Sequence, residues 1–366
     1  MTLPPNPHVA ALAPYALSDL SIPCGKRLIS LAQNESAASP SPAALAAARA
    51  ALTDAQLYPD PDWRALRAAI AEVHDLVPEH ILCGSGSMEL IGALASAYLG
   101  PGTRAATTAY GYLFFRTATR LAGAEIDLAP ETDLTVDVEA LLAMVRPETQ
   151  IVFVANPGNP TGTRIARADL IRLRDRLPGN VLLVIDEAYG EFAETSGEAM
   201  FDLAARGDTV ILRTFSKVYG LAGMRVGWGV FAPDVAGQLR KVFNPNNISA
   251  TSQAAATAAM RDQTHMRNIR AETVAHRDRF AGEMRGLGLS VGESHTNFVL
   301  LRFPSTEAAR AAANALRAEG IVMRPMGGYG LADCLRATIG GVEDMQLAHD
   351  ILADWLATWI NRETTT

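Results

Sequence analysis

Apolar positions along the chain repeat with two periods, one typical of helices and one of buried strands, and the two alternate from about residue 62. The strand-like runs are short, rich in β-branched residues and apolar throughout. Such strands are typical of parallel sheets that helices cover on both faces, so we expect an α/β fold with a mostly parallel central sheet. The clearest helices are predicted at 42–51, 62–76, 87–99 and 168–176, and the clearest strands at 150–155, 181–185 and 209–212. Asp62 is the residue expected to cap the second of these helices.

The pattern changes after about residue 260, where a second and smaller α+β unit is expected. Its helices are predicted at 264–286 and 306–319, and its strands at 297–303, 321–324 and 334–339. The first 40 residues are rich in proline and lack regular spacing. We therefore predict an N-terminal arm (1–40) that packs with the small domain, a large domain (41–260) and a small C-terminal domain (261–366).

Composition excludes several classes of protein. The 366 residues are 49% hydrophobic and 19% charged, unlike a disordered chain. A formal net charge of −7 offers no basic footprint for nucleic acid. No apolar run reaches the roughly 18 residues of a membrane span, and the start of the chain lacks the positive region of a signal peptide. Three scattered cysteines without a CxxC motif, and seven histidines without HxxxH spacing, lead us to expect a reducing cytoplasmic location and no metal.

Lysine is scarce in this sequence. Of 32 basic residues only three are lysine, namely Lys26, Lys217 and Lys241. The chain thus uses arginine where a positive charge alone is needed. A lysine can act as an amine nucleophile and arginine cannot, so Lys217, which lies in a motif of small and polar residues, becomes a candidate catalytic group.

Polar motifs follow three consecutive predicted strands of the large domain. The strand at 150–155 runs into Asn156–Gly162, the strand at 181–185 into Asp186–Tyr189, and the strand at 209–212 into the segment that holds Ser216 and Lys217. In an open α/β sheet, ligands bind beyond the carboxyl ends of the strands. These motifs therefore predict one shared site at that edge of the sheet.

The residue types at this edge suit one cofactor. A lysine amine forms a Schiff base with an aldehyde, and an aspartate against a pyridine nitrogen keeps that ring protonated as an electron sink. Asn159 and Tyr189 can hydrogen-bond a phenolate oxygen. The Gly84–Glu89 turn opens a helix, whose free N–H groups hold phosphate. It lacks the third glycine of a dinucleotide fingerprint, so the site points to pyridoxal 5′-phosphate (PLP) rather than a nicotinamide.

Taken in order, these motifs resemble the fold-type I PLP-dependent aminotransferases of class I/II, and most of all the histidinol-phosphate aminotransferase family. The resemblance covers nearly the whole chain. The matching motifs are Asn34-Glu35, Tyr58-Pro59-Asp60, Gly84–Glu89, Tyr110, Asn156–Gly162, Asp186–Tyr189, Ser216–Arg225 and Leu335–Gly340. It implies the fold-type I architecture, which is a large PLP-binding domain with a smaller α+β domain.

The resemblance also implies a role for each matching residue. Lys217 would carry PLP as a covalent internal aldimine and move the substrate proton, Asp186 would pair with the ring nitrogen, and Tyr189 would contact the ring oxygen O3′. The other cofactor contacts implied are Asn159 at O3′, Tyr110 stacked on the ring, and Ser87, Met88, Ser216 and Arg225 at the phosphate. Tyr58 would reach the phosphate of the neighbouring subunit, so the resemblance implies a homodimer with shared sites, against which the arm would also pack.

For the substrate, the resemblance implies that Arg336 clamps a carboxylate and that Arg324 lies near the distal end. Tyr15, Asn34 and Asn297 are the further substrate-site candidates. The implied reaction is a ping-pong transamination, in histidine biosynthesis, between histidinol phosphate and 2-oxoglutarate. Two alternatives stay open on the same cofactor residues: an aromatic aminotransferase with phenylalanine or tyrosine as donor, and a PLP-dependent lyase or decarboxylase. A DNA-binding regulator is disfavoured, because the first 40 residues leave no room for a DNA-binding module.

Overall fold

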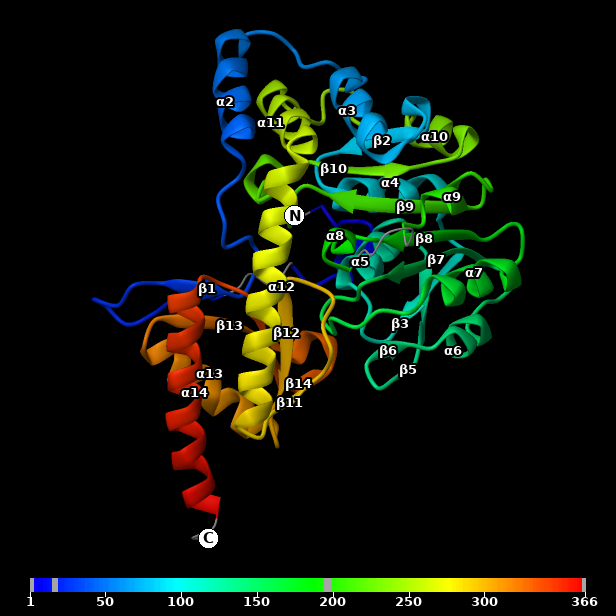
Figure 1. Cartoon of the computed structure of the whole chain (residues 1–366). Helices are drawn as coiled ribbons and strands as arrows, with labels where there is room; N and C mark the ends of the chain where they lie inside the picture. Colours follow the sequence, from blue (N-terminus) through cyan, green and yellow to red (C-terminus); the bar gives the residue numbers. More distant parts are fainter. Residues whose placement is uncertain (1–2, 15–18, 194–198, 364–366) are drawn as a thin grey trace.

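Seven strands form the larger of two main sheets in the structure, a computed structural model that describes residues 3–14, 19–193 and 199–363 (Figure 1). Its middle strands are parallel and buried on both faces, which confirms the predicted buried parallel sheet. In spatial order the strands are β2 (Ile81–Gly84), β10 (Gly227–Val230), β9 (Thr209–Thr214), β8 (Leu182–Asp186), β7 (Thr149–Ala155), β3 (Arg104–Thr108) and β4 (Glu125–Ala129).

Strand β10 runs antiparallel to both of its neighbours, β9 and β2, and the apolar pattern did not predict it. Its sequence alternates glycine with larger residues, which hides a strand from a hydrophobic pattern. The first glycine has a packing reason. A Cβ at Gly227 would lie 2.3 Å from the backbone nitrogen of Ser87, so only glycine lets β10 pass beneath the beginning of the helix that Ser87 starts.

Helices cover both faces of this sheet. They are α2 (Pro42–Ala51), α3 (Arg64–His74), α4 (Ser87–Tyr98), α5 (Leu113–Leu121), α6 (Val138–Ala143), α7 (Arg167–Arg176), α8 (Gly190–Ala193), α9 (Phe201–Ala204), α10 (Pro233–Leu239) and α11 (Ala250–Arg261). Of these, α2, α3, α4 and α7 confirm the predicted helical segments, whereas the pattern did not single out the others. Short 3₁₀ turns lie at Leu52–Asp54, Pro78–His80, Ala222–Met224 and Gly327–Tyr329, and a small hairpin joins β5 (Glu131–Thr132) to β6 (Thr135–Val136).

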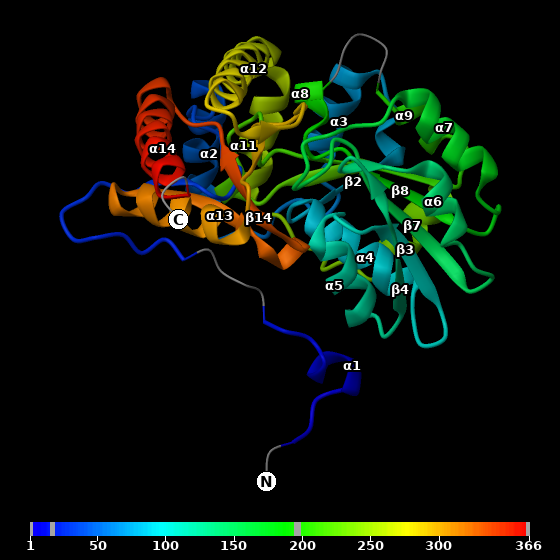
Figure 2. The same cartoon turned by 90° about the horizontal axis from the view of Figure 1, so that it is seen from below.

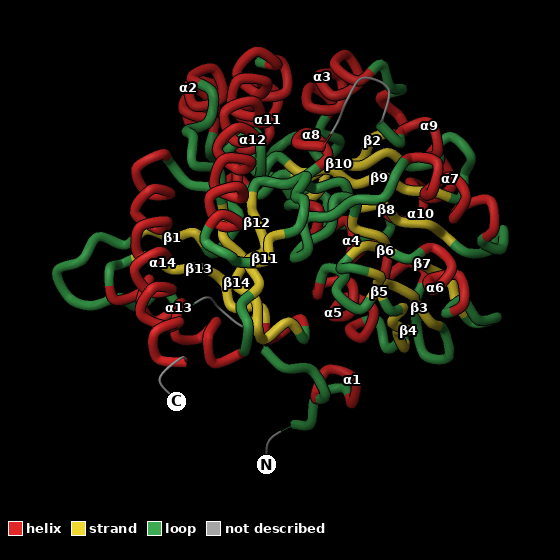
Figure 3. Tube along the Cα trace, turned by 60° about the horizontal axis from the view of Figure 1, so that its bottom comes forward, coloured by secondary structure: helices red, strands yellow, loops and turns green. Residues whose placement is uncertain are grey.

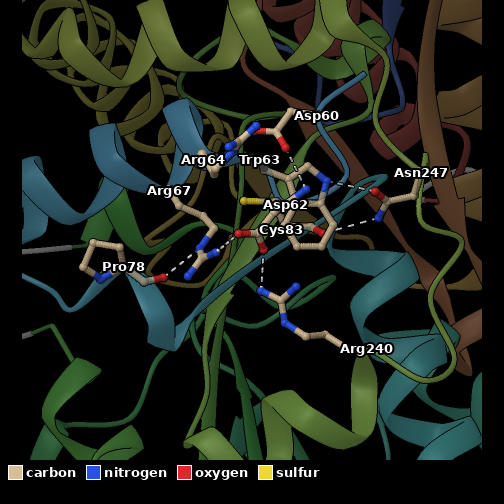
Figure 4. Close-up of polar contacts among 9 residues, drawn as sticks. All are labelled: Asp60, Asp62, Trp63, Arg64, Arg67, Pro78, Cys83, Arg240 and Asn247. Atoms are coloured by element: carbon tan, nitrogen blue, oxygen red, sulfur yellow. Dashed lines mark hydrogen bonds and ion pairs between the residues drawn. The ribbon is translucent and has the colours of Figure 1, made fainter. Parts of the chain in front are cut away.

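The start of α3 differs from the prediction that Asp62 caps it. The Asp60 carboxylate caps this helix instead, because its oxygens accept from the backbone N–H groups of Asp62 at 3.1 Å and Arg64 at 3.0 Å. Asp62 forms ion pairs with Arg67 and Arg240, at 2.7 Å each (Figure 4). The cap lies two residues earlier than expected because the chain makes an extra left-handed turn at Trp63, where φ is 50°.

The second main sheet has five strands and lies apart from the first, as the colours of Figure 3 show. Its order is β1 (Ile29–Leu31), β13 (Ile321–Met326), β14 (Leu331–Thr338), β12 (Phe298–Arg302) and β11 (Ser290–Val291). The helices α12 (Gln263–Gly286), α13 (Thr306–Ala318) and α14 (Val342–Glu363) pack on it. The helices and strands predicted after residue 260 are thereby confirmed, and α14 adds one that the pattern did not single out.

The N-terminal segment reaches both halves of the molecule. Strand β1 pairs in parallel with β13, so residues within the predicted arm complete the smaller sheet. The short helix α1 (Pro7–Ala10) lies against α5 and at the margin of the molecule in Figure 2. Each main sheet has its own hydrophobic core, which supports the three-part division at residues 40 and 260; that division stays our proposal. None of the helices in the described part of the chain is both long and apolar enough to cross a membrane.

Candidate active site

A cavity of about 650 Å³ opens where β7, β8 and β9 end, at the edge facing the smaller sheet. It brings together residues from widely separated stretches of the sequence, between Ala13 and Arg336. Of the predicted site residues, those that line it are Asn34, Ser87, Met88, Asn159, Asp186, Tyr189, Ser216, Lys217, Arg225, Arg324 and Arg336. The parallel strands deliver Asn159, Asp186 and Lys217 to one edge, as the strand-end argument expected.

Lys217 follows β9 and extends its amine into the cavity. Nζ donates a hydrogen bond to the backbone carbonyl of Asn34 at 3.1 Å and lies 5.6 Å from the ring centre of Tyr189. Burial, together with the nearby cation of Arg336, lowers the pKa of this amine to about 8. A larger share of the amine is therefore unprotonated and nucleophilic near neutral pH than for an exposed lysine.

Asp186 ends β8 and is buried at the base of the cavity. One carboxylate oxygen accepts from the backbone N–H of Ala188 at 3.0 Å. Burial is the main cause that raises its pKa to about 7, and the neighbouring Glu187 raises it further. A positive charge placed beside this carboxylate would stabilise its ionised form, so the position suits a cationic ring nitrogen.

Tyr189 lies three residues beyond Asp186 and is also buried. Its ring packs edge to face on Phe298 with centres 5.3 Å apart, and its hydroxyl oxygen accepts from the side-chain amide of Asn34 at 2.7 Å. Burial raises the pKa of this phenol to about 12, so it stays protonated and able to donate.

Two arginines enter the cavity from the smaller sheet. Arg324 on β13 and Arg336 on β14 are direct partners in an antiparallel pair. Arg336 donates to the Asn159 side-chain oxygen at 2.5 Å and to the Ala32 carbonyl at 2.8 Å. Its guanidinium also lies over the ring of Phe298, with 5.3 Å to the ring centre. These contacts fix the plane of the Arg336 guanidinium, so that it can donate two hydrogen bonds to a carboxylate.

An anion-binding corner forms where α4 begins. The helix presents the N–H groups of Ser87 and Met88 in its first turn, where no intrahelical acceptor exists. The Arg225 guanidinium lies so close that a Cβ on Gly86 would be 2.4 Å from its Nη2, and its Nη1 lies 3.4 Å from the Ser216 hydroxyl. Helix N–H groups, a hydroxyl and a guanidinium together make a phosphate site.

The structure places the two tyrosines of the turn before α5 differently, and the stacking of Tyr110 on the cofactor ring stays a prediction. Tyr112 lines the cavity, whereas Tyr110 does not. The Tyr110 ring packs on a small apolar cluster of the other sheet that includes Met326 and Leu331. The two tyrosines sit in the same turn before α5, and sequence spacing alone does not tell which one turns inward.

Tyr58 does not line the cavity of its own chain either, and its side chain is 88% exposed. Two exposed leucines, Leu52 and Leu57, lie close to it in the sequence. An exposed tyrosine beside exposed leucines, on the loop between α2 and α3, is typical of a surface that another protein chain covers.

That loop is tied to the phosphate corner through Asn247, whose contacts with Trp63 and with the Cys83 carbonyl are drawn in Figure 4. The Trp63 indole N–H donates to the side-chain oxygen of Asn247 at 3.0 Å. The Asn247 amide donates to the Glu89 carboxylate at 2.6 Å, and the same Glu89 oxygen accepts from the backbone N–H of Ser85 at 2.5 Å. The turn that begins α4 is thereby held in one shape from the loop that carries Tyr58.

Of the two remaining substrate candidates, the structure describes only Asn297. Asn297 is buried outside the cavity lining, and its amide donates to the backbone carbonyls of Asn34 at 3.1 Å and Glu35 at 3.2 Å. Tyr15 lies outside the described residues, although the preceding Ala13 and Pro14 line the cavity. Sequence reasoning missed several lining residues, among them Tyr112 and Tyr329, for which no motif gives a signal, and Glu35, which lies in a matching motif but was given no role.

Comparison with known proteins places the chain in a family. The sequence model described as "Aminotransferase class I and II" matches residues 26–351. The chain belongs to the class I and II aminotransferases. A histidinol-phosphate aminotransferase of Rhodospirillum centenum is 45% identical over 96% of this chain and 98% of its own length. The histidinol-phosphate aminotransferase of Dinoroseobacter shibae is 41% identical over 96% of this chain and 98% of its own length.

Solved structures agree with this assignment. The crystal structure of histidinol-phosphate aminotransferase from Sinorhizobium meliloti in complex with pyridoxal-5′-phosphate has a TM-score of 0.89 and 29% identity. It covers 96% of this chain and 97% of that one. Aspartate aminotransferases of Thermus thermophilus share the fold at 20–21% identity, with TM-scores of 0.80–0.83. The predicted PLP fold-type I architecture is confirmed.

The residues of this aminotransferase fit PLP, which is its cofactor. A lysine amine with lowered pKa, a buried carboxylate and a phosphate corner surround one cavity, and a Cβ on Gly86 would displace the Arg225 guanidinium from that corner. The chain is a PLP-dependent transaminase, as predicted from the sequence motifs.

Proposed function

We propose that this aminotransferase transfers an amino group from histidinol phosphate to 2-oxoglutarate in histidine biosynthesis. Relatives that match this chain over almost their whole length carry the name histidinol-phosphate aminotransferase. The single structural observation that supports an anionic substrate is the direct pairing of Arg324 with Arg336 across neighbouring strands. Like charges opposite each other on a sheet repel, and a bound anion relieves that repulsion.

The arginine pair also explains how one site can accept two unlike molecules. Histidinol phosphate carries a phosphate but no carboxylate, whereas 2-oxoglutarate carries two carboxylates. A guanidinium binds both groups through the same fork of N–H donors. We assign Arg336, which Asn159 and Ala32 orient, to the carboxylate next to the reacting carbon, and Arg324 to the distal anion.

PLP supplies an electron sink that stabilises negative charge at the substrate carbon. We propose that Lys217 bonds the cofactor and then moves the proton of that carbon as a general base and acid. Asp186 keeps the ring nitrogen protonated, and Tyr189 with Asn159 donates to the ring oxygen. Ser87, Met88, Ser216 and Arg225 hold the phosphate, and Tyr112 is one of the aromatic side chains that line the cavity.

The proposal is tested by single-turnover absorbance on the PLP-loaded enzyme. We expect histidinol phosphate to convert the cofactor band at a concentration at least about 100-fold lower than phenylalanine, because a phosphate offers the two arginines more negative charge and more acceptor oxygens than the single carboxylate of phenylalanine. Histidinol without phosphate is the matched control. The Arg324→Gln variant should still show the absorbance band of the bound cofactor, but it should no longer prefer histidinol phosphate over histidinol.

Other results identify the alternatives. Conversion by phenylalanine at equal or lower concentration would make the protein an aromatic aminotransferase. Release of a deaminated or decarboxylated product without any 2-oxo acid would make it a lyase or decarboxylase on the same cofactor residues.

We further propose a homodimer in which Tyr58 of each subunit completes the partner's phosphate site. Its 88% exposure, its absence from the cavity of its own chain, and the anchoring of its loop through Trp63 support this role. We also propose a cytoplasmic location, since the three cysteines are unpaired.

Mixing two inactive variants tests the shared site. A heterodimer of Tyr58→Ala and Lys217→Ala chains has one intact site if Tyr58 crosses to the partner. Random mixing should then restore about a quarter of the wild-type activity. Lys217→Ala mixed with Asp186→Asn is the control, because each chain keeps its own defect and nothing is restored. No recovery in the first mixture would place Tyr58 outside the partner's site.

A further inference from the structure

We propose that Asn34 is a positioning residue for the cofactor rather than a substrate contact. Its side chain sets the direction in which Tyr189 donates, and its backbone carbonyl gives the Lys217 amine a fixed acceptor. The inference rests on PLP-dependent transamination and on the role proposed for Tyr189, and it does not depend on which amino donor is used.

Asn34 has a left-handed backbone conformation. Its φ is 56°, in the left-handed region that asparagine tolerates better than most residues, and its side chain is almost fully buried, at 2% exposure. Its N–H donates to the Thr338 hydroxyl at 2.9 Å. This turn aims the Asn34 carbonyl at the large-domain side of the cavity, where Lys217 reaches it.

Thr338 also decides which way the Asn34 amide points. The single hydroxyl proton of Thr338 is directed to the Asn34 side-chain oxygen at 3.3 Å, while the hydroxyl oxygen accepts from the Asn34 backbone. With the side-chain oxygen facing Thr338, the amide nitrogen must face Tyr189. It lies 2.7 Å from the phenol oxygen. An amide nitrogen can only donate, so the phenol oxygen is the acceptor in this contact.

The consequence concerns the phenol proton of Tyr189. Because its oxygen accepts from Asn34, its own proton is turned away from Asn34 and toward the cavity. A hydroxyl that accepts one hydrogen bond also donates a stronger one, since hydrogen bonds in a chain polarise one another. Asn34 therefore prepares Tyr189 to donate to the ring oxygen of the bound cofactor.

The backbone carbonyl of Asn34 has a second function. It accepts from Lys217 Nζ at 3.1 Å and from the Asn297 amide, also at 3.1 Å. Asn297, which the sequence suggested as a substrate contact, thus anchors the carbonyl from the smaller sheet. The lysine amine has this acceptor whenever it is not bonded to the cofactor. One residue thereby connects Tyr189 and Lys217 of the large sheet to Thr338 and Asn297 beside the small one.

The test is a pH titration of the cofactor absorbance in the PLP-loaded enzyme without any substrate. A donor to the ring oxygen competes with the proton on the Lys217 nitrogen for that oxygen, so it lowers the pKa of the nitrogen. Asn34→Gly keeps the left-handed backbone and its carbonyl but removes the amide. We expect the titration midpoint to rise by about 0.3–1 pH unit, the size of one hydrogen bond.

A double-mutant cycle separates positioning from general structural damage. Tyr189→Phe alone should raise the midpoint, and adding Asn34→Gly to it should raise it no further, because Asn34 acts through the Tyr189 hydroxyl. Asn34→Asp is the second variant should the glycine variant fail to fold. It keeps the shape and replaces the donor by an acceptor, so the midpoint should rise at least as much.

Three results would overturn the proposal. One is an unchanged midpoint in both Asn34 variants, and another is an equal shift from Asn34→Gly with and without the Tyr189 hydroxyl. The third is a raised KM for the amino donor with unchanged kcat and unchanged midpoint, which would return Asn34 to the substrate site. Because no substrate is present in the titration, a wrong amino donor would leave its outcome unaffected.

Discussion

The Lys217→Arg variant is expected to lose transamination by at least about 10⁴-fold while the fold stays intact. Arginine keeps the positive charge, but its guanidinium does not lose a proton in proteins and cannot replace the amine as a nucleophile. Single-turnover absorbance with the best amino donor measures the loss. The cofactor should remain loosely bound through the phosphate corner of Ser87, Met88 and Arg225.

Lys241 provides the matched control for this prediction. It is exposed and donates to Gln238 at 2.8 Å, so Lys241→Arg should leave the activity unchanged. Chemical reduction of the wild-type holoenzyme, followed by peptide mass analysis, should find the cofactor on Lys217 and on neither of the other two lysines. Turnover within tenfold of wild type in Lys217→Arg would exclude the assigned bond.

The Lys217 amine also predicts how the rate of PLP binding depends on pH. The lowered pKa of about 8 means that the amine is mostly charged below pH 8 and mostly neutral above it. The rate at which the cofactor-free protein takes up PLP should therefore rise with pH up to about 8 and then level off. A rate that still rises steeply near pH 10 would indicate an amine with the ordinary lysine pKa.

The Asp186→Asn variant is expected to lose about 10²–10³-fold in kcat, with the cofactor still attached to Lys217. The buried carboxylate has a pKa raised to about 7 because the protein around it offers little compensation for its charge. A protonated ring nitrogen offers that compensation, and in return the carboxylate keeps the nitrogen protonated. A neutral amide cannot do so, and the ring then withdraws electrons less strongly.

Asp202 is the control for Asp186. Its carboxylate forms an exposed ion pair with Arg167 at 2.5 Å, away from the cavity, so Asp202→Asn should not change kcat. A loss of less than tenfold in Asp186→Asn, with the cofactor band present, would mean that Asp186 does not control the ring nitrogen. Loss of the band itself would instead assign Asp186 to cofactor binding alone.

Much of the site follows from the order of motifs, because parallel strands place their carboxyl ends along one edge. This is why Asn159, Asp186 and Lys217, far apart in sequence, could be expected in one cavity before any coordinates were known. The choice between Tyr110 and Tyr112 could not be made this way. Both lie in an irregular turn, where backbone direction changes at each residue and no period relates position to face.

Local sequence also misplaced a cap and gave no sign of the partners of Asn34. Asp60 rather than Asp62 caps α3, because the left-handed turn at Trp63 shifts the helix start, and that turn is stabilised by a distant partner, Asn247. The Asn34 side chain lies between Tyr189 and Thr338, and Thr338 is 304 residues away in the sequence. Neither partner can be identified from the residues around Asp60 or Asn34.

Hydrophobic periodicity and residue type were enough to predict the alternation of helices and buried strands, the PLP chemistry at the strand ends and the importance of Lys217. Both are local properties of the chain. The place of Tyr112 in the cavity lining, the pairing of Arg324 with Arg336 and the contacts of Asn34 became clear only from the folded structure. These depend on contacts between segments that approach one another only after the two sheets have packed together.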